Sequence, residues 1–371
     1  MKTRANAGSE YMRWAKLRST AKYNLATSGL AGLPLSELGA DLERLEINGD
    51  NAYGYEPLLQ TIAARYRVPG ECVVTAPGTS FANYLALAAA TEPGDEVLIE
   101  HPTYDPLLRL ADYLGLTVKR FHRRAEHDFA IDLENVERSI TPRTRVIVLC
   151  NLHNPSGAFT PDSILKKIAS LARTVGALVM VDEVYREMLF ETAPQSAFLI
   201  DPDRFIITSS LTKAYGLSGL RCGWVLAPAE LAQHMWQIHD IHAGTNVYPA
   251  EWLSVVAFSR LNHIAARAKA MLDENRRILR EFLGRRDDLE YFWPDYGTVV
   301  FPRLKFGNVD DFCELLRTEF DASIVPGRFF EYPDRFRIGV GIEPQFVRES
   351  LPQLERSLER YRSRIQAGSH A

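Results

Sequence analysis

Short apolar runs alternate with longer helical stretches between about residues 72 and 230 of the chain. The clearest predicted strands are EVLIE (96–100), RVIVLC (145–150), ALVMVD (177–182), RFIITSS (204–210) and GWVLA (223–227). The inner positions of several of them, such as VLI, VIVL and LVMV, are continuously apolar, which is typical of parallel strands covered on both faces. A helical segment between two of them opens on Pro161 and closes at Gly176. This alternation predicts an α/β domain with a mostly parallel sheet covered by helices.

A long helical pattern follows from about residue 248 to 285, and short strands and helices come after it. Its apolar stripe from Trp252 to Leu283 is typical of a helix buried in a core between two domains. We therefore expect a second, smaller domain in the C-terminal part of the chain.

Polar clusters follow four of the predicted strands at the point where each strand ends. They are HPTY (101–104), NLHNPSG (151–157), DEVY (182–185) and SSLTK (209–213). Ligands of open parallel sheets bind beyond the carboxyl ends of the strands. The sequence thus predicts that these four clusters meet in one crevice.

Lys213 lies just past a predicted buried strand, where an ammonium group is partly desolvated and a neutral amine is favoured. Such an amine can form a Schiff base with a carbonyl group, although a lone lysine here also fits a solvated helix start. Ser210 precedes Lys213 by three residues and Arg221 follows it by eight. A hydroxyl and a guanidinium beside the amine suit a phosphate group.

Asp182 ends a strongly apolar strand, where an ionised carboxylate is costly unless a cation or several donors meet it. A protonated pyridine nitrogen would meet this need, and a salt bridge to a core arginine is the alternative. Tyr185 can place its hydroxyl near the same ring, although a buried tyrosine more often serves packing.

Further candidates lie at the other strand ends. The Asn154 amide can donate to an oxygen on a bound ring, although the turn that contains it is common in loops without function. Gly78, Thr79 and Ser80 precede a helical run, so their backbone amides can bind an anion or simply cap the helix. Tyr104 is a candidate to stack on a ring.

Composition excludes several classes of protein. The chain has 371 residues, 46% of them hydrophobic and 24% charged, and no apolar run approaches the roughly 18 residues of a membrane span. Its opening sequence lacks the apolar core of a secretory signal, so we expect a cytoplasmic protein without a membrane partner. The net charge of −4 and the absence of basic blocks argue against a nucleic-acid partner.

Metal binding is not expected. His239 and His242 lie three residues apart, but no carboxylate or cysteine completes a site with them. The four cysteines are far apart without a C-x-x-C pair, which indicates reduced thiols; they are Cys72, Cys150, Cys222 and Cys313.

Six separated segments together resemble the class I/II aminotransferases of pyridoxal-phosphate (PLP) fold type I. These segments are 51–65, 74–104, 151–157, 182–185, 209–224 and 335–341, and the resemblance runs from about Asn24 to the C-terminal helix. The resemblance implies a large PLP-binding α/β domain and a smaller α+β domain built from the N- and C-terminal segments. On this basis we expect an N-terminal segment at 1–48 packed with the small domain, a large domain at 49–245, and an interdomain helix with the small domain at 246–371.

The resemblance also implies how the cofactor is bound. Lys213 matches the lysine that forms the Schiff base, and Asp182 matches the partner of the pyridine nitrogen. Tyr185 and Asn154 match the residues that bond the ring hydroxyl, and Tyr104 matches the residue stacked on the ring. Phosphate contacts are matched by Gly78, Thr79, Ser80, Ser210 and Arg221.

Three further residues match positions outside the cofactor ring. Tyr53 matches a tyrosine that reaches the phosphate in the neighbouring subunit, which implies a homodimer with shared active sites. Arg337 matches the arginine that binds the substrate α-carboxylate together with Asn154, with Arg335 as its nearest rival. Gly29 matches an N-terminal glycine near the substrate.

The implied function is transfer of an amino group between an L-amino acid and a 2-oxo acid by a ping-pong mechanism. Other reactions of amino acids can start in the same way, above all β-elimination (C–S lysis) and amino-acid cyclisation. A non-catalytic PLP-binding sensor is a further alternative. The sequence departs from the best-known aspartate and alanine enzymes, for instance in SSLTK, so the substrate cannot be inferred from them.

Overall fold

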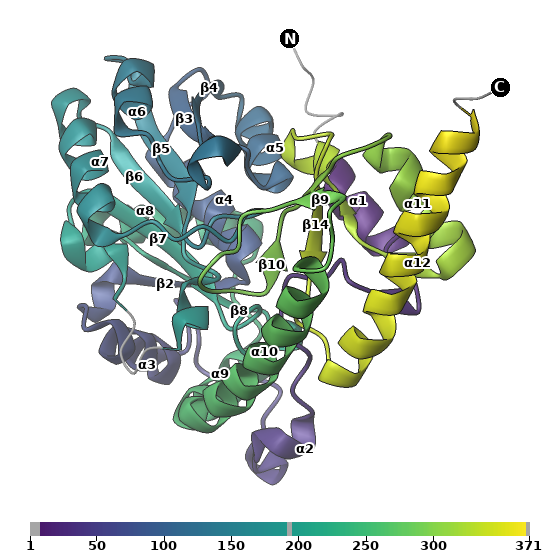
Figure 1. Ribbon diagram of the computed structural model, residues 1–371. Coiled ribbons are helices and arrows are strands. Elements are labelled where there is room, and N and C mark those ends of the chain that lie inside the picture. The colour runs from purple at the N-terminus through teal and green to yellow at the C-terminus, as the bar shows by residue number, and fades with distance from the viewer. Residues whose placement is uncertain (1–7, 191–194, 369–371) are drawn as a thin grey trace.

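The computed structural model describes residues 8–190 and 195–368. A large sheet with its covering helices occupies the left of Figure 1, and α1, α11 and α12 lie on the right. The sheet has seven strands in the order β2-β8-β7-β6-β5-β3-β4. Their bounds are Val73–Pro77 (β2), Glu96–His101 (β3), Thr117–His122 (β4), Thr144–Cys150 (β5), Leu178–Asp182 (β6), Phe205–Ser210 (β7) and Cys222–Leu226 (β8).

The sheet is mostly parallel, as the apolar runs predict. Strands β4, β3, β5, β6 and β7 pair in parallel, whereas β8 runs antiparallel to both β7 and β2. All five predicted strands are present, and the structure adds β2 and the half-exposed edge strand β4. The carboxyl ends of β5, β6 and β7 lie side by side, which brings the polar segments after them together.

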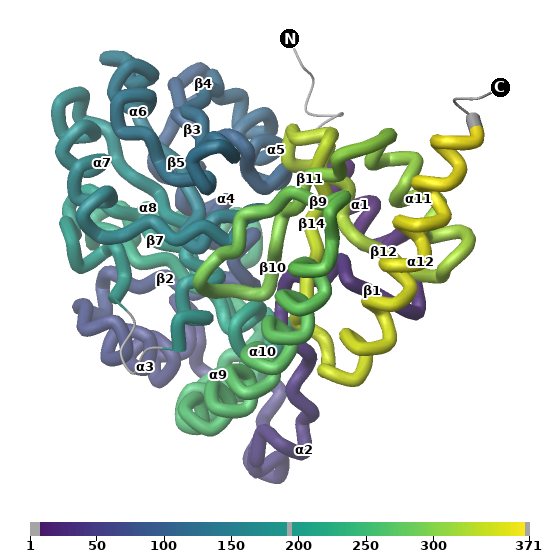
Figure 2. Tube along the Cα trace, in the orientation of Figure 1, coloured from purple at the N-terminus to yellow at the C-terminus, as the bar shows by residue number. Residues whose placement is uncertain are grey.

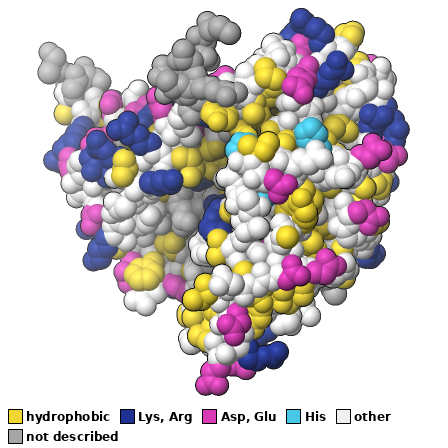
Figure 3. Space-filling view, turned by 180° about the vertical axis from the view of Figure 1, so that it is seen from behind, with side chains coloured by type: hydrophobic (Ala, Val, Ile, Leu, Met, Phe, Trp, Pro, Cys, Tyr) yellow, Lys and Arg dark blue, Asp and Glu magenta, His cyan; other side chains and the backbone are white. Residues whose placement is uncertain are grey.

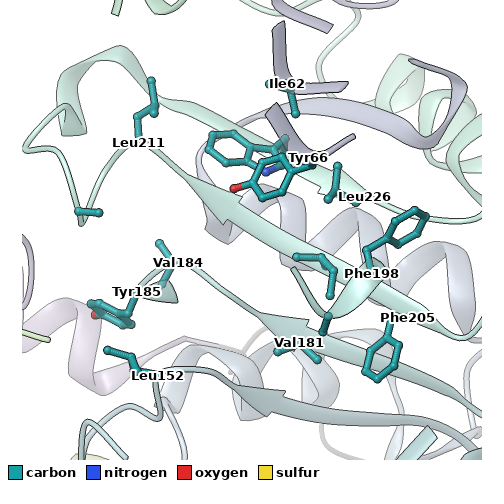
Figure 4. Packing of buried hydrophobic residues seen from close by; sticks show 14 of the residues in the cluster. Ile62, Tyr66, Leu152, Val181, Val184, Tyr185, Phe198, Phe205, Leu211 and Leu226 are labelled. Atoms are coloured by element: carbon teal, nitrogen blue, oxygen red, sulfur yellow. The ribbon is translucent and has the colours of Figure 1, made fainter. Parts of the chain in front are cut away.

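Helices cover both faces of the sheet. They are α3 (Glu56–Tyr66), α4 (Thr79–Ala90), α5 (Asp105–Leu114), α6 (Leu133–Ser139), α7 (Asp162–Val175), α8 (Ala229–His242) and α9 (Tyr248–Ser259). Neighbouring residues of one strand enter different cores, because side chains alternate between the faces of a sheet. Val181 packs in the core with α3, where Figure 4 shows Ile62 and Tyr66, whereas Met180 packs in the core with α4.

The predicted helix at 161–176 illustrates how the sequence sets the bounds of an element. Helix α7 begins after Pro161 and ends at Gly176, which adopts a left-handed conformation with φ of 73°. Glycine enters this region without the steric cost that a Cβ imposes, so it ends the helix at this point.

The long helical pattern after residue 248 forms two helices, α9 and α10 (Leu261–Leu283). Helix α10 contributes to two cores: Ile264 and Leu272 pack with the sheet, and Leu279 and Leu283 pack in a second core with α11 (Val309–Phe320) and α12 (Pro344–Gly368). This placement agrees with the expected core helix, whereas the domain boundaries at 48/49 and 245/246 stay predictions.

The second core brings both ends of the chain together. Strand β1 (Tyr23–Asn24) pairs in parallel with β12 (Ala322–Ser323), and Figure 2 shows the N-terminal segment beside α12. Helix α1 (Glu10–Leu17) precedes β1, and α2 (Leu35–Leu38) follows it. The remaining short strands are β9 (Leu289–Glu290), β10 (Val299–Val300), β11 (Arg303–Leu304), β13 (Val325–Pro326) and β14 (Phe336–Gly339). Within the described ranges, no helix is long and apolar enough to cross a membrane.

Candidate active site

A cavity of about 170 Å³ lies at the carboxyl ends of β5, β6 and β7. Nine of the predicted site residues line it: Thr79, Ser80, Tyr104, Asn154, Asp182, Tyr185, Ser210, Lys213 and Arg221. Four polar clusters that are far apart in the sequence therefore meet in one place, as expected for an open parallel sheet.

Lys213 projects its amine into this cavity. Its Nζ donates to Ser28 Oγ at 3.4 Å, and Ser28 comes from the N-terminal segment. Enclosure by the protein lowers the pKa of the Lys213 ammonium below its usual value because the ion loses hydration, and the positive charges of Arg337 and Arg221 act in the same direction. A larger fraction of the neutral amine is therefore present than for a lysine in water.

Asp182 is 3% exposed at the end of β6. Its Oδ2 accepts a hydrogen bond from Asn83 Nδ2 at 3.1 Å, and its Oδ1 accepts one from the backbone N–H of Val184 at 3.1 Å. Burial raises the pKa of Asp182 to about 6 although both hydrogen bonds and Lys213 oppose this. No arginine within the described parts of the chain forms an ion pair with Asp182, so its negative charge is free to meet a cation in the cavity.

An anion-binding corner lies at the start of α4. Thr79 Oγ1 donates to Ser210 Oγ at 2.9 Å, and Arg221 Nη2 donates to the Pro77 carbonyl at 3.1 Å. Gly78 has φ of 84°, and a Cβ at this position would come within 2.1 Å of Arg221 Nη2. Two hydroxyls, a guanidinium and a helix N-terminus thus face one corner, and this combination suits a phosphate.

The two side chains predicted at the ring hydroxyl have separate partners. Tyr185 donates its hydroxyl hydrogen to Ser28 Oγ at 2.8 Å, and burial raises the pKa of Tyr185 well above its usual value. Asn154 Oδ1 accepts a hydrogen bond from Arg337 Nη1 at 2.7 Å. Tyr104 donates to the thioether of Met12 at 3.4 Å.

Arg337 and its rival Arg335 lie in different places. Arg337 is 0% exposed on β14, and besides Asn154 it contacts the Tyr11 hydroxyl at 3.0 Å. Arg335 instead donates to the Phe301 carbonyl at 3.1 Å. Only Arg337 of this pair therefore reaches a residue that lines the cavity.

Four predicted residues lie outside the cavity lining: Gly78 and Arg337, which are described above, and Gly29 and Tyr53. A Cβ on Gly29 would stand 3.3 Å from Lys213 Cδ, so the N-terminal segment packs directly against the lysine. Tyr53 is 58% exposed, and its hydroxyl donates to Asp240 at 3.4 Å. Tyr53 thus faces outward in the monomer.

The two histidines considered as metal ligands have other partners. His239 contacts the Asn246 side chain at 3.1 Å, and His242 contacts the Tyr84 hydroxyl at 2.6 Å. Within residues 8–190 and 195–368, no three potential metal ligands lie together in a group that could hold a metal ion.

Four residues that the sequence did not predict contact the predicted side chains of this site. They are Tyr11, Met12, Ser28 and Asn83. Asn83 carried a usable signal, since it is a polar residue inside the apolar helical run ANYLALAAA. The other three belong to an N-terminal segment whose pattern gives no sign of long-range contacts.

Comparison with known proteins finds one family that spans most of the chain. The family described as aminotransferase class I and II matches residues 38–353. Capreomycidine synthase of Streptomyces vinaceus is 31% identical over 363 residues, which cover 95% of this chain and 91% of that protein. Arginine–pyruvate transaminase of Pseudomonas aeruginosa is 29% identical over 317 residues, which cover 81% of this chain and 80% of that protein.

Solved structures show the same architecture. A PLP-dependent aminotransferase from Streptococcus suis superposes with a TM-score of 0.88 at 27% identity, over 94% of this chain and 97% of that chain. A PLP-dependent cyclase superposes with a TM-score of 0.86 at 23% identity, over 95% and 97% of the two chains. At the latter identity the likeness shows the fold alone.

Proposed function

Because the chain belongs to the class I and II aminotransferases, we propose that it transfers an amino group between an L-amino acid and a 2-oxo acid. The fold is PLP fold type I, and the cofactor of this family is pyridoxal 5'-phosphate. The observation that carries the proposal is the position of Lys213 in one cavity with the Asp182 carboxylate and the anion-binding corner, beside Arg337.

The cavity fits this cofactor at three points. Lys213 offers its aldehyde an amine whose pKa is lowered by burial, and the buried Asp182 carboxylate offers a negative charge to its ring nitrogen. Thr79, Ser210 and Arg221 offer hydrogen bonds to its phosphate. Two of these points match unusual features of the protein: Asp182 is a buried carboxylate without an ion pair to an arginine in the described part of the chain, and Gly78 at the start of α4 has a φ of 84°.

The protein's own groups divide the work of amino transfer. The bound cofactor would supply an electron sink for the substrate Cα. Lys213 Nζ would remove the Cα proton, and its hydrogen bond to Ser28 Oγ would orient the amine for this step. Asp182 would keep a proton on the ring nitrogen, and Arg337 with Asn154 would bind the α-carboxylate. The same residues would act in reverse order on a 2-oxo acid, which gives ping-pong kinetics.

We further propose a homodimer in which Tyr53 of the partner subunit reaches the phosphate corner. Three large apolar side chains in this region are exposed: Tyr53 at 58%, Ile241 at 81% and Val247 at 67%. Figure 3 shows that apolar side chains are exposed among charged ones on one face of the molecule. A second cavity of about 380 Å³ is lined by Val247 and by Arg221, which also lines the first cavity. Exposed apolar surface of this kind supports a subunit interface.

Amino-acid cyclisation is the second candidate. The observation in its favour is the 31% identity to capreomycidine synthase over 95% of the chain. Cyclisation and β-elimination also begin with removal of the Cα proton, so Lys213 and Asp182 would serve them equally. The difference lies in the acceptor, because amino transfer consumes a 2-oxo acid and the other two reactions do not.

A donor and acceptor panel on the purified holoenzyme tests the proposal. Twenty L-amino acids are supplied with pyruvate, and both the oxo acid from the donor and the alanine formed are measured. We expect equal amounts of the two products for at least one donor, and none with Lys213→Ala, whereas Lys166→Ala on the exposed face of α7 should behave like the wild type. Ammonia or a cyclic product formed without alanine would contradict amino transfer.

A further inference from the structure

Helix α1 contributes Met12 to the lining of the site and is fixed there by specific contacts. Ser9 caps the helix by accepting from the Met12 N–H at 3.0 Å, and it donates to Asp105 at the start of α5 at 2.5 Å. Met12 lines the cofactor cavity and accepts a hydrogen bond from Tyr104. The preceding residue, Tyr11, therefore has little freedom to leave its place.

The Tyr11 ring is clamped by other aromatic rings. It meets the Tyr104 and Phe329 rings edge-on, with 5.5 Å and 5.8 Å between the ring centroids. Its hydroxyl oxygen accepts from Arg337 Nη2 at 3.0 Å, and the side chain is buried. This packing holds the hydroxyl beside the guanidinium.

Arg337 and Tyr11 each keep a hydrogen-bond donor that has no acceptor among the described residues. Arg337 Nη1 donates to Asn154, and its Nη2 donates to Tyr11 and to the Ala26 carbonyl at 3.1 Å. Its Nε is buried without a partner among the described residues. Tyr11 accepts from Arg337, and its own hydroxyl hydrogen meets no acceptor in the described part of the chain. Buried donors without acceptors are rare in folded proteins, and here they lie next to each other.

We infer that Tyr11 is a substrate-binding residue whose hydroxyl donates to the α-carboxylate held by Arg337. A carboxylate accepts only, at two oxygens with about four lone-pair sites, so it can satisfy both the guanidinium and the phenol. The inference rests on the proposed function, because it names a further contact of the same substrate.

The charges around Tyr11 strengthen this role. Burial alone would raise the pKa of its phenol, but the neighbouring charges of Arg337 and Lys213 outweigh burial and lower it. A more acidic hydroxyl donates a stronger hydrogen bond to an anion. Substrates that carry an α-carboxylate should therefore be preferred over amines of the same shape that lack one.

The test compares Tyr11→Phe with the wild type as holoenzymes. Calorimetric titration gives the dissociation constants of two probes: the α-methyl analogue of the best donor amino acid, which has no Cα proton to lose, and the amine that differs from the best donor only by loss of the carboxylate. Losing one hydrogen bond to a charged group should weaken binding of the amino acid by about 10- to 100-fold. The amine should bind both proteins within about threefold, and KM should rise more than kcat falls.

Tyr332→Phe is the matched control, since Tyr332 packs on the same aromatic cluster but is not among the described residues that form hydrogen bonds with Arg337. It should bind both probes like the wild type. Unchanged or tighter binding of the amino acid by Tyr11→Phe would overturn the inference, as would equal weakening of both probes, which indicates a purely structural role. Failure of the wild type to bind any amino acid would instead contradict the proposed function.

Discussion

Asp182 shows how a single buried residue links stability to function. A carboxylate at the end of an apolar strand is disfavoured by desolvation, and two hydrogen bonds offset only part of this cost. The result is a pKa of about 6 in place of the ordinary 3.8. A cation beside Asp182 would offset the cost of burying its carboxylate.

This pKa predicts a pH dependence of the cofactor-free protein. Between about pH 4 and 6 the folded state binds more protons at Asp182 than the unfolded state does, so the contribution of Asp182 to the free energy of unfolding falls as pH rises, by up to ~3 kcal/mol. Urea unfolding of the wild type and of Asp182→Asn at pH 4.5 and pH 7 measures this change in the free energy of unfolding. The variant should gain stability relative to the wild type at the higher pH.

Other buried acids do not obscure this comparison. Burial also raises the pKa of Glu100 and Glu183 to about 7, but both are present in the two proteins and cancel in the difference. A stability difference that is the same at both pH values would show that Asp182 titrates normally.

Among single residues, the sequence predicted those whose position follows from the end of a strand. Asp182, Ser210 and Lys213 end or follow apolar strands, so their convergence is a consequence of parallel pairing. Tyr11 and Ser28 could not be predicted in the same way. Their contacts with Arg337 and Lys213 depend on how the N-terminal segment folds back over both cores, and no local pattern encodes that path.

The start of α4 is the element on which phosphate binding depends. Gly78 combines a φ of 84° with a close approach of the Arg221 guanidinium, so backbone conformation and space both require glycine. The first turn of the helix then presents Thr79 to Ser210. A change at Gly78 should disturb this corner without touching Lys213.

We predict that Gly78→Ala weakens cofactor binding by at least about 10-fold, because the new Cβ displaces Arg221 and one charged hydrogen bond is lost. Equilibrium dialysis of pyridoxal 5'-phosphate against the cofactor-free variants measures this. Gly94→Ala is the matched control, since Gly94 also has positive φ, of 98°, but nothing lies within 4 Å of its Cβ position. Equal affinities of both variants would contradict the assignment of this corner.

Elements were predicted well where burial alone decides them. The continuously apolar runs at 146–150 and 178–181 lie in central parallel strands, and Gly176 ends its helix as expected. The antiparallel direction of β8 was not predictable, because an apolar run carries no sign of its orientation in the sheet. Pairs of two residues such as β1 with β12 arise from tertiary contacts rather than from local propensity.

At the scale of the whole molecule, α10 ties the sheet to the second core. One end of this helix packs against the sheet and the other against α11 and α12. The proposed substrate site also draws on both parts of the molecule. Asn154 follows strand β5 of the large sheet, and its partner Arg337 lies on β14. A carboxylate bound between Asn154 and Arg337 would therefore link the sheet to the second core.

Subunit mixing tests the proposed shared site. Lys213→Ala should be nearly inactive. Tyr53→Ala should be nearly inactive when the cofactor concentration is limiting. In a mixed dimer, one site combines an intact Lys213 with an intact Tyr53 of the partner subunit. Mixing after partial denaturation should restore about one quarter of wild-type activity, because half of the dimers are mixed and each has one intact site. No recovery, or a monomer in sedimentation, would contradict the shared site.

The most direct measurement is a half-reaction. The holoenzyme is mixed with an excess of the best donor amino acid and no 2-oxo acid, and the oxo acid released is counted per Lys213. Amino transfer predicts one equivalent and then no further product until pyruvate is added. Continuous release of ammonia, or of a cyclic product, without any acceptor would contradict the proposal.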